Sequence, residues 1–177
     1  MAKSCFLILL LLVISLEISA QWHPDQIEII RDQWGVPHIY AATDAQVSYG
    51  LAWAHAEDDF GTIQTTLLAA KGMLGLHLGK DGAIADYVVG LLRTKEIVTG
   101  HLDEVAPDFL NIVKGYLSGL NAYAKHHPQE VFVKKSFPIT VEDVFQAYVL
   151  QLAVMDGADG VIGGLIKGDI DHGALIG

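Results

Sequence analysis

Two short apolar runs near the start of the chain predict a β-hairpin. Residues 27–30 and 36–41 are mostly apolar, and the link between them, residues 31–35, is polar and includes Gly35. Short apolar runs bounded by Asp and Gly are typical of strands joined by a turn. Pro37 has no backbone N–H to donate, so we expect the second strand to lie at an edge or to carry a bulge.

Three longer segments have the spacing of amphipathic helices. The first begins at Thr43, where Thr-Asp-Ala-Gln has the form of a capping box. The second begins at Pro107, a residue favoured in a first helical turn, and the third at Thr140. Their apolar stripes predict the buried faces: Ile63, Leu67, Ala70 and Leu74; Phe109, Val113, Tyr116, Leu120 and Tyr123; and Val141, Phe145, Tyr148, Leu152 and Met155.

The links between these helices are less regular. We expect a turn at residues 79–82, a short helix over residues 83–93, an end to the second helix at residues 126–128, and a connector from 128 to 139. Gly115 and Gly119 lie one turn apart and allow another backbone to approach. Residues 156–160 break the third helix. The glycine-rich apolar stretch that follows is expected to lie across a partner surface.

The first twenty residues predict a secretory signal peptide. Lys3 precedes an unbroken apolar run over residues 6–14, and Ala20 offers a small residue for cleavage before Gln21. This predicts a periplasmic or secreted protein with residues 21–177 as its mature part. Cys5 is the only cysteine, so the mature part has no thiol for catalysis, metal binding or disulfides.

The mature part remains strongly acidic. Removal of the signal peptide takes away Lys3 and Glu17, one charge of each sign, and leaves the net charge at −10. An acidic surface repels phosphate groups. We therefore expect neither nucleic acid nor, after signal removal, a membrane as a partner.

Residue patterns alone give no complete catalytic constellation. The mature serines, Ser48, Ser118 and Ser136, lie outside any nucleophile elbow and have no base nearby in sequence. The cluster His55-Ala56-Glu57-Asp58-Asp59 lacks the spacing of a helical metal site, and a solvated or capping face is the better interpretation. We interpret His38, in the second strand, as a structural histidine.

A second polar cluster lies near the end of the chain. Asp169-Ile170-Asp171-His172 has the form of the start of a calcium loop but has no closing glutamate, so we favour a polar turn. A self-contained metallohydrolase that uses Asp169, Asp171 and His172 remains an alternative hypothesis. It requires metal-dependent activity from this chain alone.

Several short motifs in order along residues 27–155 resemble the N-terminal part of the penicillin amidase (penicillin acylase) family. The first is D-x-x-G-V-P-H-I-Y-A, beginning at Asp32. The others are Tyr49-Gly50, Ala56, Asp58, Phe60, Gln64, Gly72, Gly79-Lys80-Asp81, the segment G-Y-x-x-G-L-N-A-Y from Gly115, and Thr140-Val141-Glu142-Asp143-Val144. One position departs from the family, which usually has Arg where this chain has Asp59, so an ion pair built on that Arg is not expected here.

The resemblance implies an N-terminal-nucleophile hydrolase. Such a precursor cuts itself into an α chain and a β chain, commonly between Gly and Ser, and the first β-chain residue, a serine, uses its own α-amino group as base. The implied fold class is α+β: an N-terminal β-hairpin followed by mostly α-helices, part of an αββα sandwich completed by a β chain that this chain lacks. Gly177 falls where the resemblance places the end of an α chain.

The resemblance also implies where substrate binds. In the family the helix matching residues 140–156 lines the acyl pocket, which makes Leu152, Met155 and Asp156 the substrate-binding candidates; the first two fit a plain core equally well. The position matching the family's calcium-binding glutamate is Ile162, so calcium is a candidate cofactor of the complete enzyme only. Asp156 or Asp159 could replace that ligand.

Two functions of different kinds follow. The first is the α-chain part of an exported amidohydrolase that removes an acyl group from a small amide of the penicillin, cephalosporin or acyl-homoserine lactone type. Its partner is the β chain of the same precursor, which carries the nucleophile. The alternative is a non-catalytic exported helical domain that binds a partner protein through the apolar stretch after Gly160.

Overall fold

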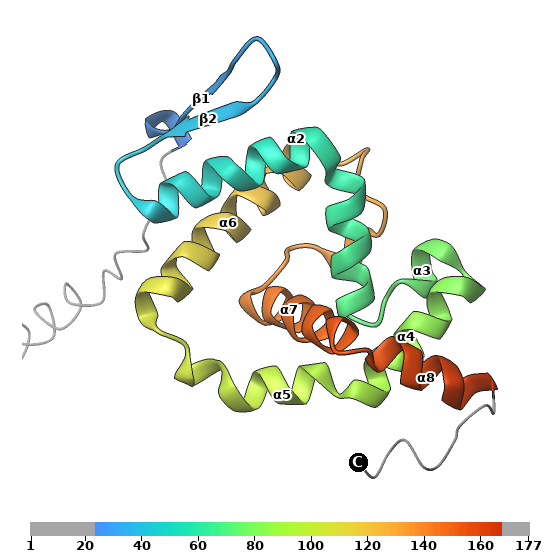
Figure 1. Ribbon diagram of the computed structural model, residues 1–177. Helices are drawn as coiled ribbons and strands as arrows, with labels where there is room; N and C mark the ends of the chain where they lie inside the picture. The colour runs from blue at the N-terminus through green and yellow to red at the C-terminus, as the bar shows by residue number, and fades with distance from the viewer. Residues whose placement is uncertain (1–23, 168–177) are drawn as a thin grey trace, which may run out of the picture.

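The computed structural model describes residues 24–167 as a hairpin followed by helices (Figure 1). A single 3-10 turn, η1 (Pro24–Gln26), leads into β1 (Glu28–Arg31) and β2 (Pro37–Tyr40), which pair antiparallel with Ile29 opposite Ile39. The backbone of Gly35 has φ 83°, a left-handed conformation that favours glycine. The predicted hairpin is confirmed. In the described part of the chain the sheet has two strands, so β2 is an edge strand.

One face of the hairpin packs on the first long helix, α2 (Asp44–Ala70). At Gly50 of α2 an added Cβ would lie 2.7 Å from Cγ2 of Ile39 and 2.9 Å from Cγ2 of Ile27. The hairpin therefore rests on a helix position without a side chain. Ile30 and Tyr40, which belong to the opposite face, are exposed.

Helix α2 begins where the capping box predicts and then bends. Thr43 Oγ1 accepts the N–H of Gln46 at 3.3 Å. The Gln46 amide oxygen reaches back to accept the Thr43 hydroxyl at 3.2 Å rather than the Thr43 backbone N–H, and the Gln46 amide nitrogen donates to Gln26 Oε1 at 3.2 Å. At Asp59 the backbone leaves helical geometry (φ −156°, ψ 63°), and its Oδ1 accepts the N–H of Thr62 at 3.1 Å. Asp59 is thus an N-cap inside α2, where a second helical segment starts in a new direction (Figure 1).

Three short helices follow: α3 (Gly75–Leu78), α4 (Lys80–Leu92) and α5 (Thr94–His101), the last continued by the 3-10 turn η2 (Leu102–Glu104). The short helix predicted over 83–93 is confirmed but begins earlier, at Lys80. The turn predicted over 79–82 is therefore wrong beyond Gly79, whose φ of 64° reverses the chain by itself. Asp86 accepts the N–H groups of Leu74 and Gly75 at 2.7 and 2.9 Å and ties α4 to α3.

The core forms where α6 (Pro107–His126) packs along α2 (Figure 1). An added Cβ at Gly115 would collide with the carbonyl group of Ala45, and one at Gly119 with that of Tyr49. The predicted close approach is confirmed. The buried core cluster comprises Ala52, Ala56, Phe60, Ile63, Leu67, Val113, Leu117, Leu120, Tyr123, Ala124 and Ile139.

After the 3-10 turn η3 (Lys134–Ser136), α7 (Val141–Met155) begins with a complete capping box. Thr140 Oγ1 accepts the N–H of Asp143, and Asp143 Oδ2 accepts the N–H of Thr140. The break predicted over 156–160 is confined to Asp156 and Gly157 (φ 85° at Gly157), because α8 (Ala158–Lys167) begins directly afterwards. The cluster of Asp169, Asp171 and His172 lies outside the described residues.

The buried face predicted for α7 is largely wrong. Val141 and Phe145 are partly buried and pack against the core. In contrast, Tyr148, Leu152 and Met155 are 55%, 60% and 74% exposed. The helix buries Asp143 and Gln146 instead. The pattern identified an apolar stripe correctly but could not say that the side chains of its second half are mostly exposed in the described part of the chain.

No helix formed by residues 24–167 is both long and apolar enough to cross a lipid bilayer.

Candidate functional site

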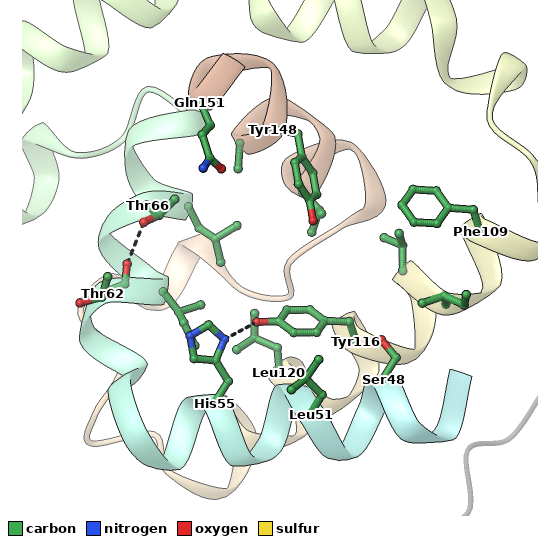
Figure 2. Close-up of a pocket in the computed structure, with 16 residues that line it drawn as sticks. Ser48, Leu51, His55, Thr62, Thr66, Phe109, Tyr116, Leu120, Tyr148 and Gln151 are labelled. Carbon is green, nitrogen blue, oxygen red and sulfur yellow. Dashed lines mark hydrogen bonds between the residues drawn. The ribbon is translucent and has the colours of Figure 1, made fainter. Parts of the chain in front are cut away.

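A cavity of about 450 Å³ opens between α2, α6 and α7 (Figure 2). Most of its wall is apolar, with hydroxyl, imidazole and amide groups at a few points, which is the usual composition of a small-molecule pocket. Its lining consists of Ser48, Leu51, His55, Thr62, Ile63, Thr66, Leu67, Phe109, Ile112, Val113, Tyr116, Leu120, Val144, Ala147, Tyr148 and Gln151.

The polar centre of this cavity is a contact between two helices. Nδ1 of His55, on α2, lies 2.9 Å from the hydroxyl oxygen of Tyr116, on α6, and Figure 2 shows the two rings pointing toward one another. Burial raises the pKa of Tyr116, and the neighbouring Tyr148 raises it further. The pair therefore carries a neutral phenol at neutral pH and can orient a polar group of a bound molecule.

The serines of the described residues do not form a nucleophile–base pair. Ser48 lines the cavity, but its hydroxyl makes no hydrogen bond with His55. Ser118 donates to the carbonyl of Lys114 at 2.8 Å and Ser136 to that of Val133 at 2.7 Å. In residues 24–167, therefore, none of the three serines is hydrogen-bonded to a histidine or a carboxylate.

The three residues predicted to bind substrate lie at the C-terminal end of α7. Leu152 and Met155 are large, apolar and mostly exposed, and Asp156 is the exposed C-cap, with its N–H bonded to the Leu152 carbonyl at 2.9 Å. None of the three lines the cavity, although Tyr148 and Gln151 of the same helix do. Their role in substrate binding stays a prediction.

Leu152 and Met155 lie with Tyr148 on one exposed face of α7, because the three positions are four and three residues apart; we call this face the α7 end surface. Large apolar side chains gathered on one surface are typical of a site covered by another part of a protein or by a ligand. The sequence pattern could not distinguish this surface from a core, because both require apolar residues at helical spacing.

The polar cluster of α2 divides into separate structural contacts. Arg31 of the hairpin lies 2.9 Å from Asp58 Oδ1 and 3.1 Å from Glu57 Oε2, and these hydrogen bonds raise the pKa of Arg31. His55 bonds Tyr116, and Asp59 caps the helix. The predicted solvated or capping face is confirmed. Asp58 therefore pairs with a strand residue 27 positions earlier.

His38 lies within the hairpin. Its Nε2 is 3.6 Å from Asp32 Oδ2, and the same carboxylate accepts the N–H groups of Trp34 and Val36 through Oδ1 at 2.9 and 3.0 Å. This arrangement braces the turn and agrees with a structural histidine.

The described residues do not form a calcium site by themselves. Residues 24–167 contain no group of three or more His, Cys, Asp or Glu side chains placed to hold a metal ion. Asp156 is the C-cap of α7, and the position expected to match the family's calcium ligand is Ile162. We therefore assign no chemical step to a metal bound by this part of the chain.

Sequence reasoning missed the cavity. It placed Phe109, Tyr116 and Tyr148 on buried stripes, whereas all three line the cavity wall and Phe109 and Tyr148 are largely exposed. The one available signal was that the α6 and α7 stripes carry aromatic residues with polar edges. Nothing in the pattern indicated that the kink at Asp59 holds the two halves of α2 around an open space.

The architecture is that of a known class of acylase. A solved thermostable penicillin G acylase from Alcaligenes faecalis superposes with a TM-score of 0.61, over 72% of this chain and 72% of that chain, at 24% sequence identity. This likeness establishes the fold.

The family model for penicillin amidase matches residues 26–155, and the chain belongs to that family. Penicillin G acylase of Escherichia coli is 27% identical over 123 residues, which cover 70% of this chain and 14% of that protein. A penicillin acylase 2 proenzyme from a Pseudomonas species is 28% identical over 55% of this chain and 12% of its own length.

The acyl-homoserine lactone acylase PvdQ of Pseudomonas savastanoi pv. phaseolicola is 28% identical over 53% of this chain and 13% of its own length. The chain thus spans only 12–14% of the length of these curated relatives. The resemblance inferred from the motifs is confirmed.

Proposed function

We propose that this chain is the α-chain part of an exported acylase that hydrolyses a linear amide. The reaction is removal of an acyl group from a small amide of the penicillin, cephalosporin or acyl-homoserine lactone type. The nucleophile is the N-terminal serine of a β chain cut from the same precursor, and residues 21–177 are the α-chain region.

The observation that carries this proposal is the family match over residues 26–155. Three facts support it. The named relatives are acylases, one of them named as a proenzyme. The chain spans a small fraction of their length. The serines of residues 24–167 lack a base, as expected if the attacking hydroxyl comes from elsewhere.

In this proposal the serine oxygen attacks the amide carbonyl, the amine leaves with a proton, and water then cleaves the acyl ester. The serine's own α-amino group is a suitable base, because an α-amine titrates near pH ~8. Residues of this chain do not react. Leu152 and Met155 form an apolar wall for the acyl group, and Asp156 bonds water or a polar group at its rim.

The β chain is the proposed partner, and two surfaces support this. The α7 end surface presents large apolar side chains without a partner among residues 24–167. The hairpin likewise has free strand edges within the described residues and an exposed face with Ile30 and Tyr40. Unpaired strand edges attract further strands. We propose that both are covered in the αββα sandwich of the complete enzyme.

Export is also a proposal. It rests on the charged start and apolar run of residues 1–20. Periplasmic or secreted location with Gln21 as the first mature residue follows from it, and N-terminal sequencing of the native protein tests both.

The test begins with the coding sequence after codon 177. The proposal expects an open reading frame that continues with a serine codon, and it expects the complete product to release free carboxylic acid from acyl amides. Replacement of that serine by alanine should abolish both self-cleavage and hydrolysis. A stop codon there, with no β chain encoded elsewhere, would instead favour a non-catalytic exported domain that binds a partner protein.

A further inference from the structure

Helix α7 packs along α5 and α2, but it buries side chains fully only near its N-terminal end. Its only buried residues, Asp143 and Gln146, lie in its first two turns, while Leu152 and Met155 in the last turn are mostly exposed. Figure 1 shows α7 passing the C-terminal end of α2. The contacts of the first turn therefore contribute, with the packing on α5, to the direction of the whole helix.

The strongest contact at that end comes from Lys71, the C-cap residue of α2. Its Nζ lies 2.7 Å from Asp143 Oδ2 and donates to the carbonyl of Ser136 at 3.0 Å. The two charged side chains are only 16% and 10% exposed. One ammonium group thus joins the end of α2, the η3 turn and the first turn of α7.

The same carboxylate completes the capping box. Asp143 Oδ2 accepts the N–H of Thr140 at 2.9 Å as well as the Lys71 ammonium. The capping box is local to α7 and cannot orient the helix relative to its neighbours. Lys71 is 72 residues away in sequence and can. A partly desolvated charge pair with fixed hydrogen bonds tolerates little change in geometry.

Because α7 is long, a small tilt at its first turn displaces its last turn by a larger distance. From Asp143 to Met155 the helix rises about 18 Å, because each residue adds 1.5 Å. A tilt of about 5° at the first turn therefore moves Met155 by about 1.5 Å, and a change of one methylene group in the fit of an apolar pocket is worth about 10–200-fold in discrimination.

We propose that Lys71 is a positioning residue for the substrate-binding end of α7: held between Asp143 and the Ser136 carbonyl, it fixes the direction of the helix and thereby the choice between long and short acyl groups. This inference rests on the proposed acylase function. Lys71 touches no reacting group, so its loss should change KM and acyl preference more than kcat.

The test uses the complete precursor product with Lys71→Met and with the double change Lys71→Met/Asp143→Asn. The double variant removes the tether without leaving an unpaired buried carboxylate. The amide oxygen introduced by Asp143→Asn can still accept the Thr140 N–H, so folding should be preserved. Lys114→Met is the matched control, because Lys114 is exposed on α6 and makes no ion pair within the described residues.

Two measured quantities test the positioning role of Lys71. The first is the ratio of kcat/KM for a long and a short acyl amide, which should change at least about tenfold in the double variant, through KM, and stay constant in the control. The second is amide hydrogen exchange of residues 148–155, which should accelerate. An unchanged ratio in a folded double variant overturns the proposal.

The two arms separate this inference from the proposed function. If the unaltered protein hydrolyses no acyl amide, the proposed function fails. The positioning role of Lys71 is then tested by hydrogen exchange alone. Faster exchange at residues 148–155 in the double variant then retains the positioning role. Exchange equal to that of the Lys114→Met control overturns it.

Discussion

The backbone of Gly115 in α6 lies directly against the carbonyl group of Ala45 in α2, so closely that a Cβ on Gly115 would overlap it. The contact recurs one turn later between Gly119 and Tyr49. These glycines let the two longest described helices meet backbone to backbone, and the core cluster and one wall of the cavity depend on that distance.

Gly115→Ala should therefore be strongly destabilising. The added methyl group forces α6 away from α2, and overpacking of this kind costs about 1–3 kcal/mol or more. Gly90→Ala is the matched control, since an added Cβ there meets nothing within 4 Å in the last turn of α4 and should leave stability unchanged or raise it by up to about 1 kcal/mol. Urea unfolding of both variants checks this, and equal midpoints would contradict the packing described.

Gln64→Leu should lower the unfolding free energy by about 2–4 kcal/mol. The buried Gln64 amide accepts the N–H of Phe132 at 2.8 Å and donates to the carbonyl of Glu130 at 3.0 Å, so leucine leaves both backbone groups without their partner. Gln129→Leu, at an exposed position in the same connector, should change it by less than about 0.5 kcal/mol. Similar losses in the two variants would rule out this role for Gln64.

Tyr116→Phe should make the protein less sensitive to alkaline pH. Burial raises the pKa of Tyr116 in the folded chain, so the unfolded chain loses its phenol proton first as pH rises. The associated stability is complete below about pH 10 and is lost as pH passes through the folded-state pKa.

The measurement is the urea midpoint as a function of pH. Between neutral pH and about pH 11 the midpoint of the unaltered protein should fall more steeply than that of Tyr116→Phe. Tyr49 and Tyr123, whose pKa values burial also raises, remain in the variant and set the common background. Parallel curves would show that Tyr116 ionises as an exposed phenol.

Leu152→Ala and Met155→Ala should change the acyl preference of the complete enzyme. Both side chains are proposed to form the acyl wall, and a methylene group in an apolar pocket is worth about 10–200-fold in discrimination. Leu91→Ala, at a similarly exposed position on α4, is the control and should leave preference unaltered. The readout is kcat/KM across a series of acyl lengths, and a series that shifts equally in all three variants would exclude Leu152 and Met155.

The sequence predicted much of this fold because its signals are local. Gly35 marks a turn, Thr43 and Thr140 are helix caps, and Val113, Leu120 and Tyr123 of the predicted α6 stripe are buried. It failed where an outcome depends on distant residues. Asp59 looks like one acid among several until its backbone is seen to restart the helix, and Leu152 looks like core because no pattern shows which partner covers it.

The central claim is that the attacking serine belongs to a second polypeptide cut from the same precursor. The most direct test is intact-mass measurement and N-terminal sequencing of the protein purified from its native source. The account predicts two co-purifying polypeptides, one starting near Gln21 and the other starting with serine. A single polypeptide that ends at Gly177, purifies alone and still hydrolyses acyl amides would contradict it.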